Sequence, residues 1–254
     1  MADDRALFGL EGKVAIVTGA SSGFGAHFSR LLAANGATVV AAARRRERLD
    51  ELANGSDAIN AVSCDVSNDD DCKRLVDTTV ERFGGVHVLI NNAGLGDPGP
   101  AIDESMEEFR YTVEVNLNAC FLLSRLVAVP MTEQAWGSIV NIASVHGLVA
   151  SAPNNQAGYA ASKGGLVNLT RELAVQWVRH GIRVNAIAPG YFETELTEEM
   201  IADDGGARWI TRNTPMRRPG VLEELDGPVL LLASDAGSYI TGQTIAVDGG
   251  WTAR

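Results

Sequence analysis

Two side chains four residues apart, Tyr159 and Lys163, form the most chemically suggestive pair in this sequence. On a helix, positions i and i+4 lie on one face, so this phenol and this ammonium group would reach the same ligand. A phenol exchanges protons poorly at neutral pH unless nearby positive charge favours its ionised form. An amphipathic residue at a helix start, with no part in chemistry, is the alternative. The pair is therefore a candidate acid and base for a reacting hydroxyl or carbonyl oxygen.

A glycine-rich turn lies early in the chain, directly after a short apolar run. Residues 14–17 predict a strand buried on both faces, and residues 18–25 follow it with Gly19, Gly23 and Gly25. Glycines let the backbone approach a pyrophosphate closely, and the next helix offers unpaired N–H groups at its start. A plain tight turn is the alternative. Its position after the first strand favours a dinucleotide-binding turn.

The position about 20 residues beyond such glycines normally distinguishes the two nicotinamide cofactors, because a carboxylate there binds the ribose of NAD. This chain has Ala43 at that position, followed by Arg44, Arg45 and Arg46. A guanidinium group binds a 2′-phosphate through two hydrogen bonds, whereas a carboxylate would repel it. The sequence therefore favours NADP(H) over NAD(H), with Arg44 and Arg45 as phosphate ligands. A solvated basic helix start is the alternative.

Strand and helix patterns alternate along the chain. Strands are expected at residues 14–17, 38–43, 61–64, 86–90, 138–142, 183–188 and 244–247. Helices are expected at residues 45–53, 69–83, from 105, at 116–134 and at 159–179. The pattern predicts an α/β fold: a Rossmann-type doubly wound parallel sheet of about seven strands with helices on both faces, in one domain over residues 1–254. Residues 191–219 break the alternation and predict a substrate lid, with a surface excursion as the alternative.

Composition restricts the partners. A net charge of −11 disfavours nucleic acid and anionic lipid, so a small molecule is the expected partner. No apolar run approaches the roughly 20 residues of a membrane span and no export signal opens the chain, which predicts a cytoplasmic protein. The cysteines Cys64, Cys72 and Cys120 have neither disulfide nor zinc spacing and are expected to be reduced, and the histidines show no ligand spacing, so no metal is expected.

Five motifs, in order and over nearly the whole chain, resemble the short-chain dehydrogenase/reductase family. They are Thr18-Gly19 with Gly23 and Gly25, Asn91-Asn92-Ala93-Gly94, Ser144, Tyr159-x-x-x-Lys163 and Pro189-Gly190. The resemblance implies an NAD(P)-dependent enzyme that transfers hydride between the cofactor and a secondary alcohol or ketone. It also implies a homotetramer.

The resemblance assigns catalytic roles to four residues. Tyr159 becomes the acid and base, and Lys163 also binds the nicotinamide ribose. Ser144 donates to the substrate carbonyl oxygen, and Asn116 supports a water that relays protons. For Ser144 the alternative is a turn former at a strand end.

The cofactor contacts implied by the resemblance extend along the chain. Asp65 and Val66 would touch adenine, and the segment at Pro189 would touch the nicotinamide amide; for Thr194 a helix N-cap is the alternative. The full set is Gly19, Ser21, Ser22, Gly23, Phe24, Gly25, Arg44, Arg45, Asp65, Val66, Asn92, Ala93, Gly94, Tyr159, Lys163, Pro189, Gly190, Phe192 and Thr194.

One segment departs from the family pattern. Fourteen residues separate Ser144 from Tyr159, about two more than the family usually has, and this loop borders the substrate. His146 and Gln156 would contact a polar substrate; exposed loop residues without a role are the alternative. The longer loop puts any transfer of substrate preference in doubt.

Residues 188–197 and the ending 247–254 resemble gluconate 5-dehydrogenase and 3-ketoacyl reductase-like members of the family. They imply a sugar acid, a polyol or a keto ester as substrate. An enoyl reductase is disfavoured because those enzymes have a wider spacing between tyrosine and lysine. A non-catalytic dinucleotide-binding sensor or scaffold is the competing class, but it would not require the serine, tyrosine and lysine together.

Overall fold

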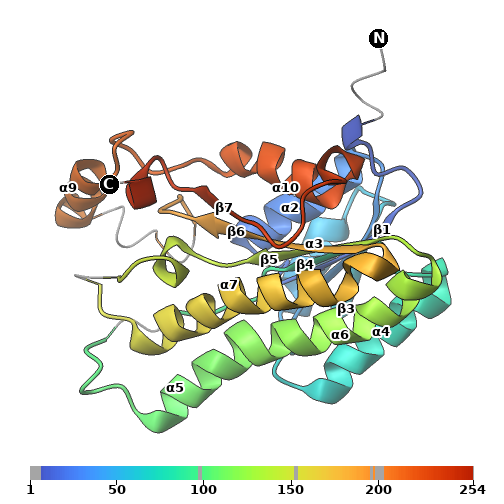
Figure 1. Ribbon diagram of the computed structural model, residues 1–254, viewed down its shortest axis with the longest axis horizontal. Helices are drawn as coiled ribbons and strands as arrows, with labels where there is room; N and C mark the ends of the chain where they lie inside the picture. Colours follow the sequence, from blue (N-terminus) through green and yellow to red (C-terminus); the bar gives the residue numbers. More distant parts are fainter. Residues whose placement is uncertain (1–6, 97–98, 152–153, 195–196, 198–202, 254) are drawn as a thin grey trace.

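A seven-stranded parallel sheet organises the computed structural model, which describes residues 7–96, 99–151, 154–194, 197 and 203–253 (Figure 1). The strands are β1 (Val14–Thr18), β2 (Thr38–Ala43), β3 (Ile59–Ser63), β4 (Val88–Asn91), β5 (Gly137–Ile142), β6 (Ile182–Pro189) and β7 (Thr244–Val247). Their order is β3-β2-β1-β4-β5-β6-β7, and every neighbouring pair is parallel. The chain winds outward in both directions from β1 and β4, which confirms the predicted doubly wound sheet.

Helices cover both faces of this sheet (Figure 1). On one face lie α2 (Gly23–Ala34), α3 (Arg46–Ala53) and α10 (Asp226–Ala233); on the other lie α4 (Asp69–Phe83), α6 (Ala119–Glu133) and α7 (Ala157–Trp177). Each face has its own apolar core: Phe28 and Leu232 belong to the first, Leu75 and Leu123 to the second. Burial on both faces explains why the central strands are continuous apolar runs.

A π-helical turn at Glu114–Asn118 joins α5 (Met106–Val113) to α6, so one continuous helix replaces the two predicted from 105 and over 116–134. An 18-residue window of this 28-residue helix has a mean hydropathy of 1.4, enough by length and composition for a membrane span, although the sequence showed no apolar run of that length. Because α6 packs against α4 and the sheet, and α5 against α7, we assign it as a core helix.

Capping explains why some boundaries were predicted residue for residue. The side chain of Asn68 accepts a hydrogen bond from the Asp71 N–H at the start of α4, and Gly84 ends that helix with a φ of 83°. Strands β2 and β7 also match the prediction. By contrast, β3 begins and ends earlier than residues 61–64, and β4 begins two residues after the predicted 86, because pairing with neighbouring strands sets these ends.

Candidate active site

A cleft of about 530 Å³ opens at the carboxyl ends of the strands, where the strand order reverses between β1 and β4. Open α/β sheets bind ligands at this switch point. Most of the predicted site residues line this one cleft. They are Gly19, Ser21, Ser22, Gly23, Phe24, Arg44, Arg45, Asp65, Val66, Asn92, Ala93, Gly94, Tyr159, Lys163 and Thr194.

The glycine turn requires its glycines for two different reasons. Gly19 and Gly23 have φ values of 65° and 49°, in the left-handed region that side chains other than glycine disfavour. Gly25 has no room instead: a Cβ there would lie 2.3 Å from the Gly19 carbonyl oxygen. The turn therefore folds tightly onto the start of α2, and Ser22, Gly23 and Phe24 at that start line the cleft.

Thr18 connects this turn to the segment after β4. Its Oγ1 accepts hydrogen bonds from the main-chain N–H groups of Asn92 and Ala93, both at 3.0 Å. The Asn92 side chain in turn donates to the Thr18 carbonyl oxygen at 2.9 Å. Asn91 lies behind them, buried, and donates to Asn141 at 2.9 Å. These bonds fix the two walls of the cleft relative to each other.

The two predicted phosphate ligands lie beside the turn. Arg45 donates to Ser21 Oγ at 3.1 Å through Nε and to Ser22 Oγ at 2.7 Å through Nη2. Arg44 lies 3.5 Å from the hydroxyl of Tyr111, which α5 contributes from the opposite wall. Arginine and serine side chains thus gather at one end of the cleft and provide donors for an anion.

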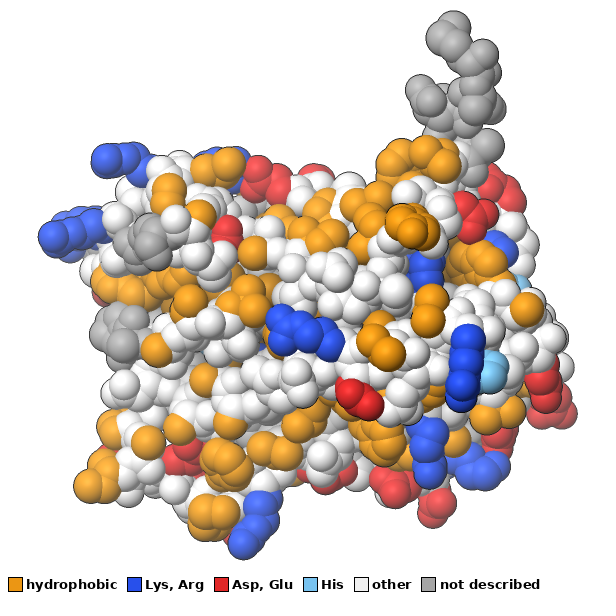
Figure 2. Space-filling view, viewed as in Figure 1, with side chains coloured by type: hydrophobic (Ala, Val, Ile, Leu, Met, Phe, Trp, Pro, Cys, Tyr) orange, Lys and Arg blue, Asp and Glu red, His pale blue; other side chains and the backbone are white. Residues whose placement is uncertain are grey.

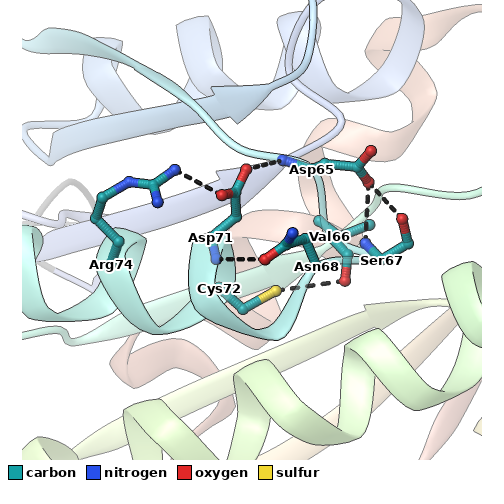
Figure 3. A network of polar contacts seen from close by, with 7 residues as sticks. All are labelled: Asp65, Val66, Ser67, Asn68, Asp71, Cys72 and Arg74. Carbon is teal, nitrogen blue, oxygen red and sulfur yellow. Dashed lines mark hydrogen bonds and ion pairs between the residues drawn. The ribbon is translucent and has the colours of Figure 1, made fainter.

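The segment after β3 is held by its own polar network (Figure 3). Asp65 Oδ1 accepts from the N–H and hydroxyl of Ser67, at 3.0 and 2.7 Å, while the Asp65 N–H donates to Asp71 at 3.0 Å. Cys72 donates to the Val66 carbonyl oxygen at 3.4 Å. These contacts present Asp65 and Val66 to the cleft as a preformed turn.

The predicted reduced cysteines are free and buried. Cys64 and Cys72, eight positions apart, share a thiol–thiol hydrogen bond that, with burial, raises the pKa of Cys64. Burial raises the pKa of Cys120 to about 11. The hydrogen bond from Cys64 lowers the pKa of Cys72, while the thiols of Cys64 and Cys120 stay protonated at neutral pH.

Tyr159 and Lys163 project from one face of α7 into the cleft, as their spacing predicted. Lys163 is 4% exposed, and its Nζ donates to the Ile142 carbonyl oxygen at 2.8 Å. The same ammonium lies 5.7 Å from the centre of the Tyr159 ring. A buried positive charge beside a phenol is the arrangement that favours ionisation of the phenol during proton transfer.

Asn116 and Ser144, two of the predicted catalytic residues, are buried and are not among the residues that line the cleft. The Asn116 amide donates to the Leu95 carbonyl oxygen at 2.8 Å and to Ser162 at 3.1 Å, and accepts from the Leu95 N–H at 2.9 Å. Asn116 lies in the π-helical turn and therefore holds the segment after β4 against that turn. Ser144 follows β5, is 7% exposed, and its Oγ accepts from the His146 N–H at 3.1 Å.

The segment after β6 begins the predicted lid. Gly190 packs on the C-terminal segment, because a Cβ there would lie 2.9 Å from Asp248 Cα, and Pro189 pairs with Val247. Phe192 is buried, packs edge-on against Phe24 at 5.5 Å and lines a separate cavity of about 370 Å³. Thr194 lines the cofactor cleft near Gly23. Residues 195–196 and 198–202 of the predicted lid lie outside the described residues.

His146 corrects the sequence analysis, which offered an exposed loop residue as its alternative. It lies in a short 3₁₀ helix, Val145–Gly147, and is 7% exposed. A buried histidine next to a candidate catalytic serine is not a solvated loop residue. Gln156, at the end of the same loop, is half-buried.

Seven cleft-lining residues were not among the predicted site residues: Ala43, Cys64, Leu95, Tyr111, Val115, Ile142 and Ala143. Tyr111 and Val115 are four apart on the helix that leads into the π turn, so one face of that helix forms a cleft wall. The spacing is visible in the sequence, but ordinary core packing produces the same pattern. Among the described residues, no group of three or more histidine, cysteine or acidic side chains is placed to hold a metal.

Comparison with known proteins identifies the family. A family model described as enoyl-(acyl carrier protein) reductase matches residues 19–252. The chain is 39% identical to gluconate 5-dehydrogenase from Gluconobacter oxydans, over 97% of each chain. It is 37% identical to a 3-oxoacyl-acyl-carrier-protein reductase from Thermotoga maritima, over 95% of this chain and 98% of that one.

Solved structures give the same result. A gluconate 5-dehydrogenase from Burkholderia cenocepacia in complex with NADP and tartrate is 34% identical, with a TM-score of 0.94 over 99% of this chain and 100% of that one. A putative gluconate 5-dehydrogenase from Beutenbergia cavernae with bound NADP is 40% identical, with a TM-score of 0.91 over 97% and 99% of the two chains.

The chain belongs to the short-chain dehydrogenase/reductase family. It is an NAD(P)-dependent oxidoreductase of the class that acts on secondary alcohols and ketones. Although the matching model carries an enoyl reductase description, the gluconate dehydrogenases and ketoacyl reductases above act on the alcohol and ketone pair. The spacing of Tyr159 and Lys163 agrees with that chemistry.

Proposed function

We propose that this protein reduces a polar ketone, or oxidises the corresponding secondary alcohol, with NADP(H) and with Tyr159 as acid and base. One observation carries the proposal: Tyr159 and Lys163 line the same cleft as the glycine turn and Arg45. A cofactor bound along that turn would extend toward the phenol. Cofactor, proton donor and substrate carbon would then meet in a single site.

Each catalytic side chain has a separate task in this scheme. The hydroxyl of Ser144 donates to the carbonyl oxygen of the ketone, and Tyr159 delivers a proton to that oxygen as it becomes an alcohol. The ammonium of Lys163, fixed by the Ile142 carbonyl oxygen, stabilises the phenolate and binds the nicotinamide ribose. Asn116 supports a water that returns the proton. The nicotinamide, when bound, supplies or accepts the hydride.

The cleft fits a dinucleotide phosphate. Gly19 and Gly25 have no space for a Cβ, so the backbone itself forms the floor on which a pyrophosphate would lie. Beyond it, Arg45 is already positioned by Ser21 and Ser22 to meet a 2′-phosphate, with Arg44 beside it. Related structures contain NADP. These observations support NADP(H) as the preferred cofactor, with Asp65 and Val66 at the adenine.

The same reasoning supports a sugar acid, a polyol or a keto ester as the substrate, since similar proteins act on gluconate or on 3-oxoacyl groups. We further propose that residues 191–219 form the lid of this site. The lid contains α9 (Asp204–Asn213), whose Trp209 ring lies 5.6 Å from the Tyr191 ring. Lid and sheet belong in this proposal to one domain over residues 1–254.

We also propose a homotetramer in the cytoplasm. Apolar side chains lie exposed on α6 and on or just beyond α7, among them Phe121, Val129, Val175 and Val178, and Figure 2 shows apolar side chains among charged ones on one face of the molecule. Leu122 and Leu126 of α6 pack against the core instead. Sedimentation velocity tests the tetramer, with a monomer as the contrary result, and cell fractionation tests the location.

The competing proposal is a non-catalytic dinucleotide sensor or scaffold. It shares the glycine turn, but it does not explain why a buried lysine and a tyrosine share the cleft with a serine behind them. Turnover separates the two proposals.

The test is a spectrophotometric assay of the purified protein with a panel of ketones, sugar acids and β-keto esters, with NADPH and NADH in parallel. We expect one compound class to oxidise NADPH faster than NADH. Tight NADPH binding without turnover on any compound would favour the sensor. Equal turnover with both cofactors would remove the NADP preference and leave the reaction class intact.

A further inference from the structure

Three side chains near the catalytic residues form a hydrogen-bonded chain that the scheme above does not use. Asn154 Nδ2 donates to the Tyr191 hydroxyl at 3.2 Å, and that hydroxyl lies 3.4 Å from His146 Nε2. Asn154 lies in the loop that is longer than the family pattern, Tyr191 begins the lid, and His146 lies two residues after Ser144. The chain of contacts therefore links the unusual loop, the lid and the catalytic strand.

The protonation states of Tyr191 and His146 bear on which group donates and which accepts in these hydrogen bonds. Burial raises the pKa of Tyr191, so its hydroxyl keeps its proton at neutral pH. Burial lowers the pKa of His146, so its ring is neutral and one ring nitrogen is an acceptor. The Tyr191 hydroxyl, which accepts from Asn154, still has its proton to donate, and His146 Nε2 is the acceptor within reach when the ring carries its proton on Nδ1. We take this Nδ1–H tautomer as part of the proposal below.

Aromatic packing fixes Tyr191 in this position. Its ring lies 5.6 Å from Trp209 of α9 and 5.2 Å from Trp251, and these two tryptophan rings are also 5.2 Å apart. In Figure 1, α9 lies beside the C-terminal segment that carries Trp251. Three segments distant in sequence therefore hold one phenol in place.

The His146 ring lies beside the reacting groups. Its centre is 6.3 Å from the centre of the Tyr159 ring in an edge-to-face arrangement, and its main-chain N–H donates to Ser144 Oγ. Nδ1 has no hydrogen-bond partner among the residues that the structure describes. An N–H donor at Nδ1 is therefore available to a ligand or to water.

We propose that His146 is a specificity-determining residue: its Nδ1–H donates a hydrogen bond to an acceptor oxygen within one or two bonds of the reacting carbon, and Tyr191 fixes the tautomer that allows it. The substrate class is then a ketone or secondary alcohol with a neighbouring hydroxyl, carbonyl or carboxylate oxygen. This inference rests on the proposed function and adds a selection rule to it.

The kinetic test compares 2-butanone with 1-hydroxy-2-butanone, with NADPH in excess. We expect the wild-type protein to favour the hydroxyketone about tenfold in kcat/KM. His146→Phe should reduce that ratio to about one, His146→Gln should restore part of it by keeping an N–H donor, and Tyr191→Phe should lower it about threefold. His180→Phe, at an exposed histidine, is the matched control and should keep the wild-type ratio.

The inference is overturned if the ratio of the two kcat/KM values is near one in the wild-type protein, or if His146→Phe leaves that ratio unchanged. In either case, turnover of the ketones still upholds the proposed function. If neither ketone reacts, the proposed function loses support with this pair, and a second measurement still decides the inference. Nitrogen-15 correlation spectra of the histidine rings, assigned with His146→Phe, should show the Nδ1–H tautomer for His146 and a shift toward Nε2–H in Tyr191→Phe. An Nε2–H tautomer in the wild-type protein overturns it.

Discussion

The four-residue spacing of Tyr159 and Lys163 accounts for only part of their arrangement. The helix puts both side chains on one face, but it is the carbonyl oxygen of Ile142, from the end of β5, that fixes the ammonium. Lys163 is buried and paired with a neutral acceptor, so its charge remains available to the phenol beside it. In the proposed scheme, the proton chemistry therefore depends on a contact between a helix and a strand.

Replacing Tyr159 by phenylalanine tests this assignment. Without the hydroxyl no proton reaches the substrate oxygen, so kcat should fall by about 10²- to 10⁴-fold. The dissociation constant for NADPH, measured by fluorescence, should change less than about threefold. Tyr239→Phe removes a fully exposed hydroxyl and should leave kcat unchanged. Substantial turnover by Tyr159→Phe would mean that another group supplies the proton.

The proposed preference for NADP(H) also rests on single residues. Arg45→Ala removes a guanidinium that two serines hold at the cleft, so KM for NADPH should rise about 10- to 100-fold while KM for NADH stays the same. The neighbouring Arg46 pairs with Asp50 on α3, so Arg46→Ala is a matched control with no expected effect. Steady-state kinetics with both cofactors measure this, and an equal rise for both would contradict a role in phosphate binding.

At the scale of elements, the glycine turn and the segment after β4 behave as one unit. Thr18 accepts hydrogen bonds from that segment, and a Cβ at Gly19 would lie 2.8 Å from Ala93 Cα. Neither segment can move without the other. The cleft floor is therefore preformed by backbone packing, and a ligand need not organise it.

Gly25→Ala tests this packing. The added Cβ would lie 2.3 Å from the Gly19 carbonyl oxygen, so the turn must shift, with a loss of about 1–3 kcal/mol in the free energy of unfolding. NADPH binding should weaken at least tenfold. Gly227→Ala is the matched control: its Cβ meets no atom within 4 Å in α10, and helix propensity predicts a stability that is unchanged or about 1 kcal/mol higher. Calorimetry with and without NADPH measures both, and wild-type binding by Gly25→Ala would show that the turn is adaptable.

At the scale of the whole molecule, two histidines make stability depend on pH. Burial lowers the pKa of His146, and burial together with the charge of Lys13 lowers the pKa of His87. Both histidines bind protons less readily in the folded chain than in the unfolded one. The contribution of these two histidines to the free energy of unfolding is therefore full above the ordinary histidine pKa of about 6.5. It decreases as the pH falls below that value.

Urea unfolding at pH 5.5 and pH 8 measures this dependence. We expect the free energy of unfolding to fall toward pH 5.5, by at most about 1.4 kcal/mol per pH unit for each histidine. In the wild-type protein, His87 Nδ1 accepts a hydrogen bond from the Val14 N–H at 3.1 Å. His87→Asn keeps an acceptor for this N–H but cannot titrate. The difference in the free energy of unfolding between pH 5.5 and pH 8 should therefore shrink. His180→Asn should keep the wild-type difference. An unchanged difference in His87→Asn would assign the pH dependence to other groups.

Local patterns in the sequence predicted much of the fold. Buried parallel strands are continuous apolar runs, so β2 and β7 were found at their true ends, and α4 was found because Asn68 and Gly84 cap it. The spacing of Tyr159 and Lys163 and the run from Arg44 are short-range features that one sequence displays directly. The continuous helix through Asn116 was divided in two, because a π turn depends on contacts with neighbouring segments.

The sequence by itself determined the alternation of strands and helices, the glycine turn and the residue types available for proton transfer and phosphate binding. These depend on properties of a residue and its near neighbours. Only the tertiary structure decided that His146 is buried and in contact with Tyr191, and that Trp209 and Trp251 hold that tyrosine. Burial and side-chain pairing between distant segments follow from the packing of the whole chain, which no local spacing encodes.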